Sequence, residues 1–455
     1  MSHFLKYFCS ASIIFITFVG CESERKNPNF QQEAANPEFL HRSLLSLTSV
    51  IKHDLFAPMV AARIYAYANI AGYEALIAGS PTHKSLVGQL NELTDLPKPK
   101  AGKEYCYPIA SVKAYLKVGK KWTFSEDSIE AVTVRLLQEF KQIGIPKDVF
   151  ERSVAYGDAI GDAIIAWSAK DNYAQTRSMP KYSVKMKDPS RWQPTAPDYA
   201  DAVEPHWNKI RTFVMDSAAQ FKPIPPTPHN TDKTSKFYKE AYEVYKSVLD
   251  STAERIATAR YWDDSPSSTQ NAGHVNFTIK KITPPGHWLH IAMYVARQQK
   301  TDIYSTAEIN ALLSIALFDG VISCWDEKYR SEVVRPETYI TKNINQNWLP
   351  IIVTPPFPEY TSGHSVFSGS ASQILAHIYG DKVSYTDSTE VQFGMPPRTF
   401  NTLSEAADQA AISRLYGGIH YRPAIEVGVK QGRAVGDFIF NKVKMKNKVP
   451  TSLLR

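Results

Sequence analysis

Helical periodicity is the feature that most constrains this chain, because apolar residues recur at three- and four-residue steps and seldom at the two-residue step of a strand. No run of hairpins and no internal repeat is found. The predicted fold is therefore all-α, with two packed helical bundles and long proline-rich loops. The periodic stretches are 39–78, 125–166, 236–259, 288–298, 307–328, 364–379, 403–416 and 424–441.

One long stretch, 173–235, lacks the periodicity and contains nine prolines. A loop of this length inside a domain indicates a functional or wrapping segment. Its large aromatic side chains indicate that it packs against the protein: Trp192, Tyr199, Trp207 and Phe221. The expected division is a signal peptide 1–20, a tether 21–37, an N-terminal helical region 38–270 containing this loop, and a C-terminal helical domain 271–448.

Composition excludes several classes of protein. With 43% hydrophobic and 21% charged residues, the 455-residue chain has the makeup of a globular protein. The net charge of +7 is not concentrated in any run of lysine and arginine, which argues against a nucleic-acid partner. The same positive excess suits small anionic molecules.

The first residues resemble a bacterial export signal. Lys6 precedes an apolar run, 10–19, that is too short to span a bilayer. The junction Gly20-Cys21 resembles the lipobox of bacterial lipoproteins, which predicts lipidation at Cys21 and a periplasmic or outer-membrane lipoprotein in the cell envelope. The alternative is an ordinary secretory signal with an incidental cysteine. No later stretch has the length and apolar character expected of a membrane helix, so membrane contact is expected only through the lipid.

Four cysteines are too few for a disulfide scaffold at this length. Cys9 leaves with the signal peptide. Nothing in the sequence brings Cys106 and Cys324 together, so we expect two unpaired thiols.

Three polar clusters in the last third of the chain carry the chemistry. In the first, Lys328 and Arg335 are seven residues apart, nearly two helical turns, and would project from one face of a single helix. Pro336 places Arg335 at or near the end of that helix. Two stacked cations suit an oxyanion, although two solvated basic residues would give the same pattern.

In the second cluster a proline-rich loop, 355–358, leads into a helix capped by Thr361 or Ser362. A helix start presents unpaired N–H groups to an anion, and Gly363 allows close approach of the backbone. His364 exchanges a proton near neutral pH. A capped helix with an incidental histidine is the alternative.

The third cluster begins with Arg414 and ends with His420. Gly417-Gly418 ends the first helix, and Pro423 suits the first turn of the next. His420 then lies on a tight connection from which it can reach back toward Arg414. Packing of His420 against Tyr421 is the alternative for this cluster alone.

Together these residues resemble the three-part signature of the superfamily of vanadium-dependent haloperoxidases and type 2 phosphatidic acid phosphatases. The resemblance covers about 280–442, and Trp325 and the 355–358 loop are similar to the soluble haloperoxidase branch. It implies vanadate as cofactor, with phosphate able to occupy the same site. It also implies that His420 bonds vanadium, that His364 is the general acid–base, and that the oxygens are bound by Lys328, Arg335, Ser362, Gly363 and Arg414.

Two positions depart from the superfamily pattern. Thr361 stands where proline usually precedes Ser362. Ala424 stands where an aspartate commonly orients the last histidine through its second ring nitrogen. Glu426 and Asp319 are the substitutes that we considered for that carboxylate.

Three functions follow from these patterns. The first is oxidation of halide by hydrogen peroxide at a bound vanadate. The second is an acid phosphatase that cleaves phosphate esters in the same pocket, with His420 as nucleophile. The third is a non-catalytic carbohydrate-binding lipoprotein, which has no use for the Arg414 and His420 arrangement.

Overall fold

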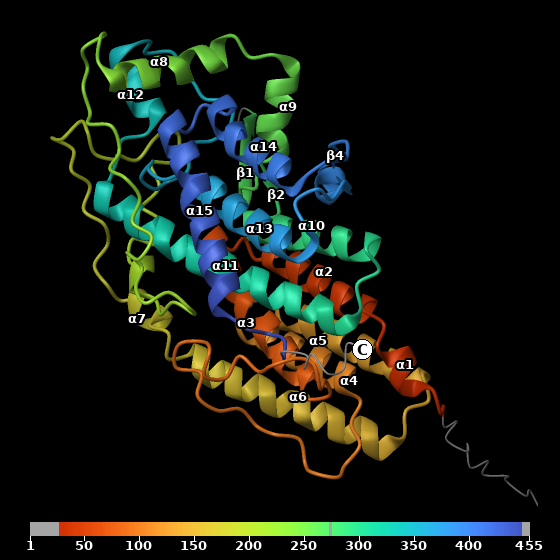
Figure 1. Cartoon of the computed structure of the whole chain (residues 1–455). Helices are drawn as coiled ribbons and strands as arrows, with labels where there is room; N and C mark the ends of the chain where they lie inside the picture. Colours follow the sequence, from red (N-terminus) through yellow and green to blue (C-terminus); the bar gives the residue numbers. More distant parts are fainter. Residues whose placement is uncertain (1–26, 273–274, 448–455) are drawn as a thin grey trace, which may run out of the picture.

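The structure is a computed structural model that describes residues 27–272 and 275–447. The predicted signal peptide 1–20 and the predicted lipidation site Cys21 lie outside the described residues. The described part is mostly helical, as predicted, and its helices form two bundles (Figure 1). Cys106 and Cys324 are both buried and free, also as predicted.

The N-terminal bundle is built around α3, which is buried along almost its whole length and packs against α4 and α6. Pro58 occupies the first helical position of α3, where its missing N–H costs nothing. The helices of this bundle are α1 (Phe30–Ala34), α2 (Glu38–His53), α3 (Pro58–Ile77), α4 (Tyr107–Lys121), α5 (Glu126–Gln142) and α6 (Lys147–Ser168).

The C-terminal bundle surrounds α13, which packs against α11, α14 and α15. Its helices are α8 (Lys236–Leu249), α9 (Ala253–Tyr261), α10 (Pro284–Gln298), α11 (Ile303–Ser331), α12 (Pro336–Asn343), α13 (Gly363–Tyr379), α14 (Leu403–Tyr416) and α15 (Arg422–Lys442). The long helix α11 also contacts α3 and joins the two bundles (Figure 1). Among the described residues it is the one helix long and apolar enough to cross a membrane, contrary to our expectation that none would be, but 94% of its apolar window is buried inside the protein.

Periodicity merged or missed several helices. The stretches 39–78, 125–166 and 236–259 are each two helices, separated by short turns. Periodicity also missed α4, although Lys113, Lys117 and Lys121 recur at four-residue steps and form a polar stripe along it. Its other sides are covered by α3, α6, α5 and α2.

Two small antiparallel hairpins supplement the helices. In the first, β1 (Ser267–Ala272) pairs with β2 (Val275–Lys280), with Ser267 opposite Lys280. In the second, β3 (Tyr385–Asp387) pairs with β4 (Arg398–Phe400), and a 3₁₀ turn, η2 (Thr389–Phe393), lies between the two strands.

The loop 173–235 wraps the C-terminal bundle and contains only a short helix, α7 (Tyr173–Thr176), and a 3₁₀ turn, η1 (Trp207–Lys209). Trp192 and Trp207 are buried and Phe221 is half-buried, as expected of a packed loop. Tyr199 is 66% exposed, so this aromatic side chain does not anchor it. The loop is tied down by backbone bonds such as Trp192 N–H to the Glu332 carbonyl at 2.7 Å.

The described part of the predicted tether, 27–37, is not an extended linker. It contains α1, and the side chains of Phe30 and Ala34 are buried in the core. Burial of two apolar side chains orders a segment whose polar composition suggested a free tether.

Candidate oxyanion site

Lys328 and Arg335 do not share one helix, contrary to the prediction. The helix α11 ends at Ser331, and Glu332 then adopts a left-handed conformation with φ of 50°. Arg335 is the N-cap residue of α12, and Pro336 is the first residue of that helix. The two cations therefore reach the site from separate elements that meet at a sharp turn.

Lys328 is fully buried under the proline-rich loop. Its Nζ donates to the carbonyl oxygens of Pro358 and Glu359 at 2.9 and 3.0 Å. The ammonium also lies 5.0 Å from the ring centroid of Phe357 and 5.7 Å from that of Trp325. Burial lowers the pKa of Lys328 to about 7. An anion beside it would restore its full charge.

Arg335 is also fully buried, and three of its contacts fix the guanidinium. Nε donates to the Phe357 carbonyl at 2.8 Å, and Nη1 donates to the Ile419 carbonyl at 3.0 Å. Nη1 also lies 3.1 Å from Nε2 of His420. Nη2 is buried with no hydrogen-bond partner among the described residues.

The second cluster forms the start of α13, as predicted. Ser362 is the N-cap residue, and its Oγ accepts the N–H of Ser365 at 3.3 Å. Its own N–H donates to the Ala424 carbonyl at 3.1 Å, which ties the helix start to α15. Gly363 is buried in the first turn, where the backbone N–H groups of a helix lack intrahelical acceptors.

His364 faces the same cavity from α13. Its side chain is 20% exposed, and its imidazole is hydrogen-bonded to the Trp262 backbone. Within the described part of the chain Nε2 has no hydrogen-bond partner, and it lies 3.9 Å from Oδ2 of Asp264. Burial, reinforced by the nearby Arg414 charge, holds the pKa of His364 well below its usual value. The ring is therefore neutral at pH 7 in this structure.

Arg414 lies in the last turn of α14 and is 2% exposed. Its Nη1 donates to the Trp262 carbonyl, and its Nη2 lies 3.9 Å from Oδ1 of Asp263. Its Nε is buried and has no hydrogen-bond partner among residues 27–272 and 275–447. Gly418 has φ of 82°, so the Gly417-Gly418 pair turns the chain after α14 as predicted. That turn brings His420 back toward the cluster.

The carboxylate that orients His420 is Glu359, not either of the substitutes considered from the sequence. Oε1 of Glu359 lies 2.8 Å from Nδ1 of His420. Asp319 is instead bonded to backbone N–H groups of the wrapping loop, and Glu426 is 58% exposed beside Arg422. The position expected to hold the aspartate, Ala424, supplies a backbone carbonyl to Ser362.

These contacts define the tautomer of His420. Arginine has no acceptor, so Nη1 of Arg335 must donate to Nε2, and Nδ1 must carry the proton given to Glu359. Burial lowers the pKa of His420 well below its usual value and raises that of Glu359 to about 7. The lone pair of Nε2 is thus directed to the cationic side of the site.

The three clusters meet at a cavity of about 340 Å³. Its polar end is lined by Gly363, His364, Arg414, His420, Asp263 and Asp264, and its apolar walls include Trp325 and Phe357. Lys328, Arg335 and Ser362 are buried beside this end. Unsatisfied buried donors, from Arg335 Nη2 and Arg414 Nε, make it a ready site for an anion with several oxygens.

Sequence reasoning did not find Glu359, Asp263 or Asp264. Glu359 stands inside the second cluster, three residues before Ser362, and its position between a proline and a tyrosine gave no hint of its orientation. The pair Asp263-Asp264 follows α9, more than 60 residues before the first cluster. Only the packing of α9 beside α14 brings this pair to Arg414.

A mostly helical protein whose buried cationic cavity is lined by two histidines has a site of the class that suits an oxyanion. The family described as the VCPO second helical-bundle domain matches residues 308–448. The crystal structure of a bacterial vanadium-dependent iodoperoxidase superimposes with a TM-score of 0.85 at 48% identity, covering 90% of this chain and 98% of that one. The chain is a haloperoxidase-like enzyme and belongs to the vanadium-dependent haloperoxidase family.

More distant relatives show the same fold. The holo-type bacterial vanadium-dependent chloroperoxidase has a TM-score of 0.67 at 16% identity and covers 92% of this chain and 97% of that one. The vanadium chloroperoxidase of Curvularia inaequalis is 28% identical over 127 residues, which are 22% of this chain and 20% of that protein. The match therefore spans about a fifth of that chloroperoxidase.

Proposed function

We propose that this enzyme binds vanadate in the cavity and uses hydrogen peroxide to oxidise a halide, with iodide as the first candidate. The family supports the cofactor, and the 48% identical relative, described as an iodoperoxidase, supports the halide. The observation that carries the proposal is the set of buried donors without partners among the described residues, Arg335 Nη2 and Arg414 Nε, next to Nε2 of His420, whose lone pair accepts from Arg335 Nη1. The two guanidinium groups would bind the oxygens of vanadate, and Nε2 of His420 would bind its metal centre.

Different residues of the cavity would bind different parts of the oxyanion. Lys328, Arg335 and Arg414 would neutralise its charge, and Ser362 and the Gly363 N–H would bind further oxygens. His420 would bond vanadium through Nε2, and Glu359 would keep the proton on Nδ1. A ring nitrogen held in this way by a carboxylate is a fixed and more basic ligand.

When bound, vanadate supplies the Lewis-acidic centre that makes hydrogen peroxide an effective oxidant of halide. The protein's own task is then to move protons and exclude water. His364 is neutral, faces the cavity and has an unpartnered Nε2, so it can accept a proton from incoming peroxide. Trp325 and Phe357 cover the cationic end and keep its dielectric low.

Phosphate-ester hydrolysis is the competing reaction for this pocket. Ala424 in place of the aspartate would leave His420 poorly oriented if no other carboxylate replaced it, and poor orientation would harm a nucleophile most. Glu359 removes that argument, because it orients His420. The preference for halide oxidation over ester hydrolysis is therefore supported by the family and by the 48% identical iodoperoxidase.

The decisive experiment compares both reactions in one preparation. Purified protein should oxidise iodide with hydrogen peroxide only after vanadate is added, and should not cleave para-nitrophenyl phosphate when vanadate is absent. His420→Ala should abolish iodide oxidation and His364→Ala should strongly reduce it. His377→Ala, which changes a partly exposed histidine on the same helix as His364, should leave it unchanged. Vanadate-loaded protein that cleaves the ester but oxidises neither iodide nor bromide would overturn the proposal.

A further inference from the structure

A chain of buried polar side chains continues inward from His364. Oδ2 of Asp264 lies 3.9 Å from Nε2 of His364, and Oδ1 of the same carboxylate lies 2.8 Å from Nδ1 of His287. The other ring nitrogen of His287 lies 2.7 Å from Oδ2 of Asp387. The side chains of Asp264, His287 and Asp387 are at most 1% exposed. Asp264 thus stands between two histidines, one at the cavity and one in the core.

Both nitrogens of His287 face carboxylates, so both must donate and the ring must be an imidazolium. Burial alone would lower the pKa of His287, but the charges of Asp264 and Asp387 outweigh it and raise the pKa well above its usual value. One positive charge is therefore held between two negative ones, and all three side chains are buried.

The orientation of the His287 ring is fixed as well as its charge. Trp262 stacks on it with the centroids 4.7 Å apart and the planes at 19°. Asp387 is itself anchored, because its Oδ1 accepts the N–H of Thr389 at 2.9 Å. His287 can therefore present Nδ1 to Asp264 in only one direction. Trp262, which stacks on His287, also accepts a hydrogen bond from Arg414 through its backbone carbonyl.

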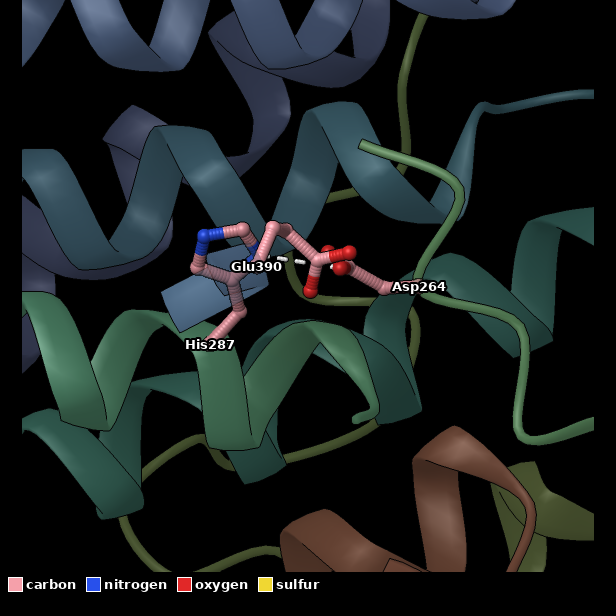
Figure 2. A group of neighbouring side chains, drawn as sticks. All are labelled: Asp264, His287 and Glu390. Atoms are coloured by element: carbon pink, nitrogen blue, oxygen red, sulfur yellow. Dashed lines mark hydrogen bonds and ion pairs between the residues drawn. The ribbon is translucent and has the colours of Figure 1, made fainter. Parts of the chain in front are cut away.

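Asp264, His287 and Glu390 also come within 4.8 Å of one another, a spacing that could hold a metal ion (Figure 2). Neither carboxylate oxygen of Glu390 has a hydrogen-bond partner among the described residues. His287, however, has no free lone pair, because Asp264 and Asp387 occupy both nitrogens. The imidazolium itself supplies the positive charge that a metal would bring. Burial, with the Asp264 charge, raises the pKa of Glu390 to about 8, which keeps this third acid protonated at neutral pH.

We propose that His287 is a positioning residue that fixes the Asp264 carboxylate beneath His364 and so sets the geometry of the oxyanion site. The inference rests on the proposed function, since it assigns a purpose to that same cavity. The two carboxylates next to the cavity then have different roles. Asp263 lies against Arg414, whereas Asp264 is held toward His364 by an imidazolium that does not contact the bound anion.

A double-mutant cycle on vanadate-free protein tests this. Vanadate affinity is measured by calorimetry for wild type, His287→Gln, Asp264→Asn and the double variant, with neither peroxide nor halide present. We expect His287→Gln to weaken vanadate binding about tenfold, the lower end of the scale on which outer partners of a metal site act. In the Asp264→Asn background the same substitution should change affinity less than about twofold, because its effect passes through Asp264.

The cycle separates positioning from a general loss of positive charge. A purely electrostatic effect of His287 would persist after Asp264 is neutralised, and that result would overturn the inference. His290→Gln is the matched control. His290 lies on the same helix as His287 and is 4% exposed, and its one side-chain hydrogen bond within the described residues joins Nε2 to Thr48 Oγ1 at 3.3 Å. It should keep wild-type affinity even if its melting temperature falls.

Two further outcomes decide the matter. Elemental analysis of the purified wild type should find no divalent metal in stoichiometric amount. A metal that is retained by wild type and lost in both His287→Gln and Glu390→Gln would instead make this cluster a metal site and overturn the inference. Wild-type protein that binds vanadate and gives the expected cycle, but oxidises no halide, would contradict the proposed activity while supporting the role of His287.

Discussion

Oε1 of Glu359 lies 2.8 Å from Nδ1 of His420 and accepts the backbone N–H of Tyr421 at 2.9 Å. One carboxylate oxygen thus fixes both the ring of the histidine and the chain that carries it. The carboxylate comes from the proline-rich loop before α13, whereas the usual pattern takes it from the helix after the histidine. Glu359 therefore supplies the carboxylate that the site needs, although it lies more than 60 positions from Ala424 in the sequence.

Glu359→Gln should therefore weaken vanadate binding about 10- to 100-fold, because a glutamine no longer holds the Nδ1 proton with a charge. Calorimetric titration of the vanadate-free protein measures the change. Glu308→Gln serves as control, since Glu308 is a largely buried acid of α11 that pairs with His83 and Lys446 rather than with residues of the site. Equal affinities for wild type and Glu359→Gln would show that His420 does not need this partner.

The sequence predicted the helical fold and the three clusters because each depends on local rules. Helical periodicity, the serine N-cap before Gly363 and the glycine pair after Arg414 all act within a few residues. The same local reasoning failed at Arg335, where Glu332 adopts a left-handed conformation that ends α11 early. A seven-residue spacing indicates a shared helical face only if the helix continues.

The carboxylates of the site could not be predicted for a different reason. Glu359, Asp263 and Asp264 act through contacts that join segments far apart in the sequence, and no spacing rule connects them. Whether a buried acid meets a histidine depends on how α9, α13 and α14 pack, which a single sequence does not state. The loop 173–235 was predicted as a wrapping segment, but its backbone bond to the site, from Val203 N–H to the Pro356 carbonyl, was not.

Arg414→Ala should weaken vanadate or phosphate binding by more than about 1.5 kcal/mol, the scale of one charge-assisted hydrogen bond. The guanidinium is 2% exposed and already bonded to the Trp262 carbonyl, so its position costs little to maintain when the anion binds. Arg433→Ala is the control, because Arg433 is partly exposed and pairs with Asp408 on the surface. Titrations that give the same affinity for wild type and Arg414→Ala would contradict a single shared pocket.

Glu74 should make stability depend on pH. Its carboxylate is 5% exposed and accepts the Leu86 N–H at 2.6 Å and the Ser85 hydroxyl at 2.7 Å, but burial still raises its pKa from 4.5 to about 7. Below about pH 4.5 the group is protonated in both the folded and the unfolded chain. Between about 4.5 and 7 only the unfolded chain ionises it, so the free energy of unfolding falls as pH rises.

Urea denaturation of wild type and Glu74→Gln at several pH values between 4.5 and 8 isolates this contribution. The free energy of unfolding of wild type should decline relative to that of Glu74→Gln by about 3 kcal/mol at most over this range. Glu74→Gln has a neutral side chain at every pH, so it is the reference against which the pH dependence of wild type is measured. A difference between the two proteins that does not change with pH would rule out a raised pKa at Glu74.

Cys21 is predicted to carry the lipid that anchors the protein to the envelope. Labelled palmitate should enter the wild type when it is expressed in a bacterial host, and Cys21→Ala should not take up label. Cys9→Ala changes a cysteine inside the predicted signal peptide and should be labelled like wild type. Equal labelling of wild type and Cys21→Ala would mean that Cys21 is not lipidated and that the first residues are an ordinary secretory signal.

Asp319 should hold the wrapping loop to the core. Its Oδ1 accepts the N–H of Phe213 at 2.7 Å, and its Oδ2 accepts those of Val214 and Met215 at 2.8 and 3.1 Å. The side chain is fully buried, and burial raises its pKa to about 6 despite these three bonds. In Asp319→Asn the amide nitrogen cannot accept, so at least one buried N–H loses its partner.

That loss should lower the free energy of unfolding by about 1–3 kcal/mol. Limited proteolysis should then cut the variant within 173–235 faster than it cuts wild type, since the loop covers the site from Val203, whose N–H donates to the Pro356 carbonyl at 2.9 Å. Asp408→Asn, which changes an acid that is 64% exposed on α14, is the matched control and should alter neither measurement. A loop that stays protected in Asp319→Asn, with unchanged unfolding, would mean that its apolar anchors Trp192 and Trp207 hold it without the carboxylate.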